Sequence, residues 1–212
     1  MTTTPRTQVL FFDGVDDLDP VGPLEILTAA GLPVSPVRPV DHPTTVHTAH
    51  GLTLELDAVL DDTAELVIVP GGGWLDAGPG VRDQTTGALP AQLAAMHARG
   101  TVIASVCTGA MLLAAAGLLD RRPAVTNRGA FDELAAAGAI VEREARVVDT
   151  GDVVTSGGPA AGLDLGVHLV GRFLGPDAGR AAAARLEHEP VGPVLTTATH
   201  TRDAHESTVK NS

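Results

Sequence analysis

The sequence predicts an α/β protein, a three-layer α/β/α sandwich with a mostly parallel sheet and a nucleophile elbow. Short apolar runs rich in β-branched residues alternate with longer helical segments, a pattern typical of parallel sheets covered by helices on both faces. The run 101–117 passes from such a strand into an apolar helix across a tight turn, as a nucleophile elbow does. The chain has 212 residues, a length that fits one sizeable domain.

We expect that domain to cover residues 1–193 and the polar tail 194–212 to be frayed or disordered. Strands are expected at 8–12, 33–40, 65–69, 101–106, 125–127, 139–148 and 153–156. Helices are expected at 20–30, 87–99, 110–119, 130–137, 156–174 and 176–186. The strand 33–40 contains three prolines, so we place it at an edge of the sheet.

The turn of the elbow carries Cys107, the single cysteine of the chain. Ser105 and Gly109 flank it at two residues' distance, and small residues there let the chain turn without clashes. The backbone N–H groups at a helix N-terminus favour thiolate over thiol, and the thiolate is the nucleophile. A small inert core residue is the alternative interpretation of a lone cysteine, but this context favours a reactive Cys107.

The loop after the first strand carries three carboxylates, Asp16, Asp17 and Asp19. Asp19 precedes Pro20, so it is either the N-cap of the following helix or a functional carboxylate. Glu25, further along the same helix, is either a solvated residue or a buried partner of the thiol.

A glycine triplet, 71–73, directly follows the strand 65–69 and precedes Trp74. Glycines there let backbone N–H groups approach a ligand, as an oxyanion hole requires, although an ordinary flexible loop has the same composition. Trp74 either covers the mouth of a pocket or fills a gap. We expect His47 and His50, on a loop or hairpin within 44–57, to be solvated rather than metal ligands.

The carboxyl ends of parallel strands meet at one edge of a sheet, where such folds bind ligands. The loops after 12, 69, 106 and 156 can therefore converge there. This would bring Asp19, the glycines 72–73, Cys107 with Thr108, and the turn 156–159 around one cavity.

Composition excludes several other classes of function. A net charge of −12 would repel a phosphate backbone, so we expect no nucleic-acid partner. The first residues lack the apolar stretch of a signal peptide, and no apolar run has membrane-spanning length. We therefore expect a soluble, cytoplasmic protein without a membrane partner. One cysteine excludes an internal disulfide and disfavours a thiolate metal site.

The sequence resembles the ThiJ/PfpI superfamily, which has the class I glutamine amidotransferase-like fold, and within it the isonitrile hydratases. The stretches that carry the resemblance are 12–25, 70–73, 104–119, 155–164 and 186–190. They span nearly the whole domain in the family's order. The resemblance implies a flavodoxin-like sheet and a homodimer.

The resemblance also implies a reaction in which water adds to the terminal carbon of a small isonitrile and gives an N-substituted formamide. Cys107 would be the nucleophile and Asp19 its acid/base partner, with no metal or organic cofactor. Two routes stay open: thiolate attack followed by hydrolysis of a thioimidate, or direct activation of water by Asp19. The expected substrate-binding residues are Gly72, Gly73, Trp74, Thr108 and Gly158, with backbone N–H groups near Gly72 and Thr108 stabilising developing charge.

The sequence departs from the family pattern at two positions near this site. Asn127 stands where a histidine is usual, and Pro159 where a β-branched residue is usual. Peptidase-like relatives place a histidine directly after the cysteine, but here Thr108 follows. We interpret the pair His188-Glu189 as structural. Two alternative functions remain: a redox-responsive or small-molecule-binding protein without turnover, and a glyoxalase or deglycase.

Overall fold

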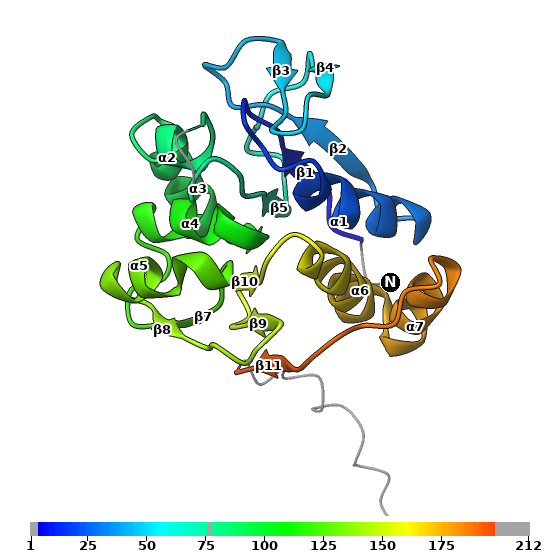
Figure 1. Ribbon diagram of the computed structural model, residues 1–212. Helices are drawn as coiled ribbons and strands as arrows, with labels where there is room; N and C mark the ends of the chain where they lie inside the picture. The colour runs from blue at the N-terminus through cyan, green and yellow to red at the C-terminus, as the bar shows by residue number, and fades with distance from the viewer. Residues whose placement is uncertain (1–3, 76–77, 198–212) are drawn as a thin grey trace, which may run out of the picture.

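The computed structural model describes residues 4–75 and 78–197, which form a seven-stranded sheet between two layers of helices (Figure 1). The strand order is β11-β9-β10-β6-β5-β1-β2. These strands are β1 (Thr7–Leu10), β2 (Val34–Val37), β5 (Leu66–Val69), β6 (Val102–Ser105), β9 (Val147–Asp149), β10 (Val153–Ser156) and β11 (Val194–Thr196). β9 pairs antiparallel with β10, and the other pairings are parallel. The expectation of a mostly parallel sheet is confirmed.

Helices cover both faces of this sheet, which confirms the three-layer prediction (Figure 1). One layer contains α1 (Leu18–Ala29), α6 (Ala161–Leu174) and α7 (Pro176–Arg185). The other contains α2 (Val81–Gln84), α3 (Leu89–Ala98), α4 (Ala110–Ala115) and α5 (Phe131–Ala136). Among the residues described, no helix is long and apolar enough to cross a membrane.

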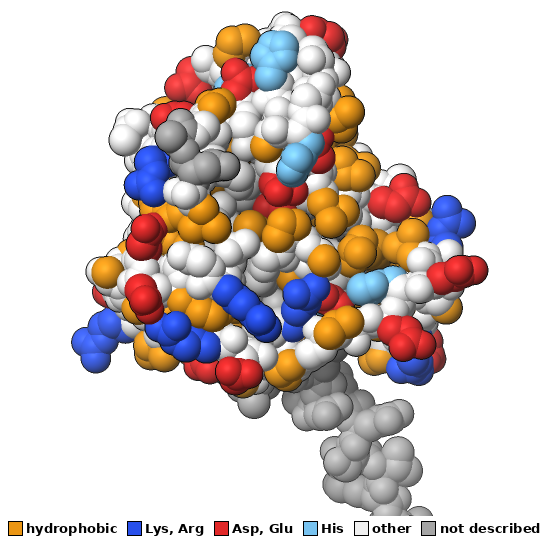
Figure 2. Space-filling model, in the orientation of Figure 1, with side chains coloured by type: hydrophobic (Ala, Val, Ile, Leu, Met, Phe, Trp, Pro, Cys, Tyr) orange, Lys and Arg blue, Asp and Glu red, His pale blue; other side chains and the backbone are white. Residues whose placement is uncertain are grey.

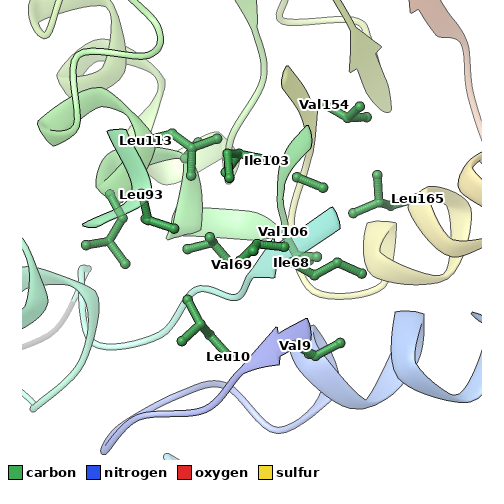
Figure 3. Close-up of a cluster of buried hydrophobic side chains, with 14 of the residues drawn as sticks. Val9, Leu10, Ile68, Val69, Leu93, Ile103, Val106, Leu113, Val154 and Leu165 are labelled. Carbon is green, nitrogen blue, oxygen red and sulfur yellow. The ribbon is translucent and has the colours of Figure 1, made fainter. Parts of the chain in front are cut away.

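The core lies on both sides of the central strands (Figure 3). The strands contribute fully buried side chains at their centres: Val9, Ile68, Ile103 and Val154. Leu93 of α3 and Leu113 of α4 pack against them from one layer, and Leu165 of α6 from the other (Figure 3). Aliphatic side chains thus fill a core with few aromatic residues, and they hold the strand ends that carry the loops in fixed positions.

Close packing between α1 and α6 depends on glycine. A Cβ at Gly166 would lie 3.0 Å from the Cβ of Ile26, and one at Gly162 would lie 3.4 Å from the carbonyl oxygen of Asp19. The first distance is short for a Cβ contact and the second is at the edge of ordinary contact, so glycine at both positions lets the two helices pack closely. This packing fixes the first turn of α1, where Asp19 lies.

Two predicted strands are wrong. The segment 139–148 divides into β8 (Ile140–Val141), which pairs with β7 (Pro123–Ala124) in a separate two-stranded sheet, and β9. A turn closed by the hydrogen bond from Ala145 N–H to the Glu142 carbonyl separates β8 from β9, because the charged residues 142–144 have no place in a buried sheet. The segment 125–127 is an irregular connection rather than a strand, and its Val125 N–H donates to the Thr155 hydroxyl.

Strand β2 lies at an edge of the sheet, as its prolines predicted. The segment 44–57 contains a small hairpin of β3 (Thr45–His47) and β4 (Thr53–Glu55). The helix expected at 110–119 ends at Ala115, since Gly117 adopts a φ of +74°, which favours glycine and terminates helices. The helix expected from 156 begins only at Ala161.

The expected start of a disordered tail at residue 194 is corrected by β11. Its residues pair parallel with β9, and the N–H of Thr197 donates to the Asp149 carbonyl. This pairing supplies the backbone hydrogen bonds that an edge segment otherwise lacks. The remainder of the predicted tail, 198–212, lies outside the described residues, and a single domain over 1–193 stays a prediction.

Candidate active site

Cys107 stands on a sharp turn between β6 and α4, in a short 3₁₀ turn over Cys107–Gly109. Its φ is +56°, a conformation that is strained for any residue other than glycine and is typical of functional sites. Its N–H donates to the Gly157 carbonyl at 2.8 Å, and its carbonyl accepts from the Thr126 hydroxyl at 2.8 Å. These bonds from two other loops hold the strained turn in place.

Gly109 permits the turn sterically. A Cβ at this position would lie 2.3 Å from the carbonyl oxygen of Val69 and 2.7 Å from that of Pro70. The small residue expected two positions after the cysteine is therefore needed because the elbow passes directly over the end of β5.

Asp19 is fully buried in the first turn of α1. The helix begins at Leu18, so the interpretation of Asp19 as an N-cap is wrong. Its Oδ2 accepts the N–H of Gly71 at 2.7 Å, and its Oδ1 has no hydrogen-bond partner among the described residues. A buried carboxyl oxygen without a partner is costly and rare in folded proteins, so this one points to a function.

The surroundings of Asp19 shift its ionisation to neutral pH. Burial, and then the charge of Asp16, raise its pKa from 3.8 to about 7. The N–H of Gly71 and the neighbouring Cys107 side chain act in the opposite direction. Asp19 can therefore both accept and release a proton near pH 7, which general acid–base catalysis requires.

The thiol of Cys107 is likewise buried. Burial and the charge of Asp19 raise its pKa to about 12, whereas hydrogen bonds from Asn127 and from the N–H of Thr108 lower it. The expectation that the helix N-terminus favours thiolate is therefore corrected, since burial and the neighbouring carboxylate outweigh the backbone donors. At neutral pH the resting sulfur is a thiol, and its proton must leave when the sulfur reacts.

Asn127 follows β7 and reaches the sulfur with its side chain. Its Nδ2 lies 3.4 Å from the Sγ of Cys107, and its Oδ1 accepts the N–H of Gly129 at 2.9 Å. Gly158, expected to bind substrate, borders the same amide, because a Cβ there would lie 3.2 Å from Asn127 Nδ2.

The glycine-rich loop lies beside the elbow, but its glycines are needed for packing. A Cβ at Gly72 would lie 2.2 Å from the Gly14 carbonyl, and one at Gly73 would lie 1.9 Å from that of Pro79. The N–H of Gly72 donates to the Thr108 hydroxyl at 3.0 Å. Its donation to a substrate therefore stays a prediction and requires Thr108 to release it.

Trp74 is half-buried and connects α2 with α5. Its indole N–H donates to the carboxylate of Glu133, and its ring lies over the guanidinium of Arg82 at 4.3 Å from the ring centroid. These contacts hold the end of the glycine-rich loop against two helices. They fit a gap-filling role, and contact with substrate stays a prediction.

The other candidate residues lie on the surface or in ion pairs. The ring of His50 is exposed and accepts or donates one hydrogen bond with Asp17 at 2.8 Å; Figure 2 shows histidine side chains at the end of the molecule that carries β3 and β4. Glu25 is exposed, 3.9 Å from Arg185. His188 contacts the buried Asp164 at 3.0 Å, as a structural residue does. Among the described residues, no group of three potential ligands could hold a metal ion.

A cavity of about 920 Å³ lies between α6, α7 and β11 and does not include Cys107. Three of its polar groups bind one another, since Asp149 Oδ2 lies 2.7 Å from His168 Nε2 and Oδ1 lies 3.0 Å from Arg172 Nη1. A closed network of this kind stabilises helix packing. We therefore place the candidate active site at Cys107, where a strained residue and an unsatisfied carboxyl oxygen meet.

Three residues of this site were not assigned roles from the sequence: Asp16, Thr126 and Asn127. Asp16 was noted only as one of three loop carboxylates, although its charge raises the pKa of both Asp19 and Cys107. One feature of the sequence indicated a role for Asn127: it stands where the family usually has a histidine. No feature indicated a role for Thr126, because its segment has the composition of a strand.

The fold and the site define a class of α/β protein in which a cysteine on a nucleophile elbow faces a buried carboxyl group. The model of the DJ-1/PfpI family matches residues 5–172, and the chain belongs to that family.

Comparisons with known proteins agree with this assignment. The chain is 33% identical to an isonitrile hydratase of Pseudomonas putida over 87% of this chain and 78% of the relative. It is 26% identical to the Parkinson disease protein 7 homolog of Danio rerio over 85% of this chain and 96% of that relative. The crystal structure of a ThiJ/PfpI family protein from Pseudomonas syringae is similar with a TM-score of 0.77 and 27% identity, over 91% of this chain and 78% of that one.

Proposed function

We propose that this protein is an enzyme that hydrates isonitriles to N-substituted formamides through Cys107 and Asp19. One observation carries the proposal: a buried carboxyl group with a pKa of about 7 lies beside the thiol. The terminal carbon of an isonitrile accepts a soft nucleophile and must gain a proton. The site offers the sulfur and a proton carrier side by side, and the 33% identity to an isonitrile hydratase supports the same reaction.

In the first half-reaction, the Asp19 carboxylate accepts the thiol proton as the sulfur attacks. The C–S bond forms at the isonitrile carbon, and Asp19 returns that proton to the carbon. The product is a neutral thioimidate on Cys107, and Asp19 is again a carboxylate. The resting thiol therefore needs no prior ionisation.

In the second half-reaction, Asp19 accepts a proton from water while the water oxygen adds to the thioimidate carbon. That proton passes to nitrogen, and the tetrahedral intermediate collapses as its hydroxyl proton moves to Asp19. The C–S bond breaks and the sulfur recovers a proton from Asp19. The sum is one isonitrile plus one water to one formamide. Direct activation of water by Asp19 is the alternative route.

The test uses cyclohexyl isocyanide under reducing conditions. Infrared loss of the isonitrile band, with mass detection of N-cyclohexylformamide, measures turnover by the unmodified protein. We expect Cys107→Ser and Asp19→Asn to lower the rate of turnover roughly 100-fold or more. Glu25→Gln, which changes an exposed carboxylate on the same helix, is the matched control and should retain activity. Formamide production that survives Cys107→Ser would contradict the proposal.

Acid-quenched samples separate the two routes. A Cys107 peptide heavier by the mass of the isonitrile indicates the thioimidate, and its absence at full turnover favours direct water activation. The same preparations distinguish the other functions. Consumption of methylglyoxal without any reaction of the isonitrile would indicate a deglycase, and binding without turnover a non-catalytic role.

We further propose that the enzyme acts in the cytoplasm as a homodimer. Two apolar residues near the start of α1, Leu18 and Val21, are 40% and 44% exposed. Figure 2 shows apolar side chains across the part of the surface where α1 and α6 lie in Figure 1. Light scattering after size-exclusion chromatography tests the assembly, and Val21→Asp should shift a dimer to a monomer.

A further inference from the structure

The sulfur of Cys107 has one side-chain hydrogen-bond donor, the amide of Asn127, among the residues that the structure describes. Nδ2 lies 3.4 Å from Sγ, within the range of a hydrogen bond to sulfur. Asn127 is half-buried, so this bond is shielded in part from competing water. The contact joins the connection after β7 to the elbow after β6, two segments that are distant from Asp19 in the sequence.

The orientation of this amide is fixed by its other end. The N–H of Gly129 needs an acceptor, and the Oδ1 of Asn127 supplies it at 2.9 Å. With the oxygen held by Gly129, the NH₂ group must face the sulfur. The backbone of the same segment is held too, because Thr126 donates its hydroxyl to the Cys107 carbonyl at 2.8 Å. Residues 126 and 127 thus bind the main chain and the side chain of Cys107 together.

Negative charge develops on this sulfur twice in the proposed reaction. It appears when the thiol proton moves to Asp19 before attack, and again when the C–S bond breaks. The charge of the neighbouring Asp19 carboxylate raises the pKa of the thiol, so it opposes the first loss of the thiol proton. A neutral donor on another side of the sulfur stabilises the negative charge on the sulfur without adding a group that titrates.

We propose that Asn127 is a catalytic residue whose amide N–H donates to the Cys107 sulfur and stabilises its negative charge during attack and during expulsion of the product. The part of this inference that concerns expulsion of the product rests on the proposed function. The part that concerns attack depends on the reactivity of the sulfur itself and holds for any reaction of Cys107. The direction in which Asn127 shifts the pKa of the thiol, downwards, agrees with it.

The first measurement is independent of isonitriles: the rate of Cys107 alkylation by iodoacetamide as a function of pH. We expect Asn127→Ala and Asn127→Asp to slow alkylation about 10- to 100-fold at pH 8, the loss typical of a hydrogen bond to a charged group. Asn127→Asp keeps an acceptor for Gly129 but replaces the donor with a negative charge beside the sulfur, so it should slow alkylation at least as much as Asn127→Ala. Arg128→Ala, an exposed neighbour, is the control and should alkylate as the unmodified protein does.

The second measurement is turnover of cyclohexyl isocyanide. Asn127→Ala should lower kcat by a similar factor and leave KM within about twofold, since the bond acts on the sulfur rather than on the substrate. Circular dichroism and thermal unfolding show whether the variants are folded. If folded variants have the same alkylation profile as the unmodified protein, the proposal is overturned even if hydration occurs. Slowed alkylation in a protein that hydrates no isonitrile supports the sulfur contact and refutes the proposed reaction instead.

Discussion

The carboxylate of Asp19 accepts a hydrogen bond from the backbone N–H of Gly71 at 2.7 Å, at the carboxyl ends of the neighbouring strands β1 and β5. Asp19 lies in the first turn of α1, after β1, and Gly71 follows β5. A Cβ at Gly71 would lie 2.8 Å from the same carboxylate and 2.6 Å from the Thr108 hydroxyl. Glycine at position 71 thus allows α1, the glycine-rich loop and the elbow to meet at the sulfur.

The pH dependence of turnover follows from the protons that Asp19 and Cys107 hold together. The pair carries two protons below pH 7 and one between about 7 and about 12. Only the one-proton form can move a proton from sulfur to the isonitrile carbon. We expect kcat/KM to rise with pH through an apparent pKa near 7 and then to stay level through pH 9. A profile that falls between pH 6 and 8 would contradict this assignment.

Asp19→Asn should stabilise the fold while it removes activity. The folded pKa of Asp19 is raised from 3.8 to about 7, so the folded state binds more protons than the unfolded state between these pH values. Its contribution to stability is present below pH 4 and lost as the pH rises towards 7. A shift of this size corresponds to about 4 kcal/mol. Asparagine keeps the shape of the side chain and has no charge to bury.

Urea unfolding at several pH values measures this effect. We expect the free energy of unfolding of Asp19→Asn to exceed that of the unmodified protein by about 2–4 kcal/mol at pH 8. The difference should be small at pH 4, where the folded Asp19 is neutral and the unfolded one is only about half ionised. Glu25→Gln should show no such pH-dependent gain, and an equal gain in that control would refute burial as the cause.

Local patterns were sufficient to predict most strands of the sheet, its main helices and the elbow. The strand at 101–106 and the small residues around Cys107 predicted a sharp turn, and the convergence of strand ends predicted that Asp19 would approach it. The first expectation concerns a short segment whose conformation depends on its own residues, and the second follows from the rule that the carboxyl ends of parallel strands meet at one edge of the sheet. The family, which the sequence resembles, and its fold are confirmed by the match over residues 5–172 and by the similar solved structure.

Features that depend on tertiary contacts could not be predicted in this way. Strand β11 forms because β9 offers it an edge, which no pattern within 194–196 reveals. The ionisation of Cys107 depends on burial and on a carboxylate 88 positions away in the sequence, so a rule based on helix ends gave the wrong direction. Asn127 reaches the sulfur from a segment that resembles a strand.

Gly109→Ala should destabilise the fold by distorting the elbow. The added Cβ would lie 2.3 Å from the Val69 carbonyl oxygen and 2.7 Å from that of Pro70, and neither backbone atom can move without disturbing β5. We expect the free energy of unfolding to fall by about 1–3 kcal/mol and turnover to fall with it. Gly87→Ala is the control, because its nearest neighbour would be 3.7 Å away. Equal stability of the two variants in urea would contradict the steric argument.

Asp149→Ala should destabilise the fold without affecting the chemistry at Cys107. Asp149 is fully buried, and it binds His168 at 2.7 Å and Arg172 at 3.0 Å. Its removal leaves both partners without their carboxylate. Breaking a buried pair in this way lowers the free energy of unfolding by about 3–5 kcal/mol. Hydrogen bonds from His168 and Gly151 help to lower the pKa of Asp149 below 3.8 despite its burial. Its contribution is therefore present above pH 4 and lost as the pH falls through the folded pKa.

Urea unfolding at pH 7 and pH 3 measures this contribution against a matched control. Asp177→Ala removes a carboxylate that is 93% exposed and paired with Arg180 on the surface, where such pairs contribute little. We expect a large loss of stability for Asp149→Ala at pH 7, a smaller one at pH 3, and almost none for Asp177→Ala at either pH. The alkylation rate of Cys107 in the folded Asp149→Ala variant should equal that of the unmodified protein, because the network lies in a cavity that does not include the elbow. A loss below 1 kcal/mol at pH 7 would show that the carboxylate is not needed to hold α6 against β9.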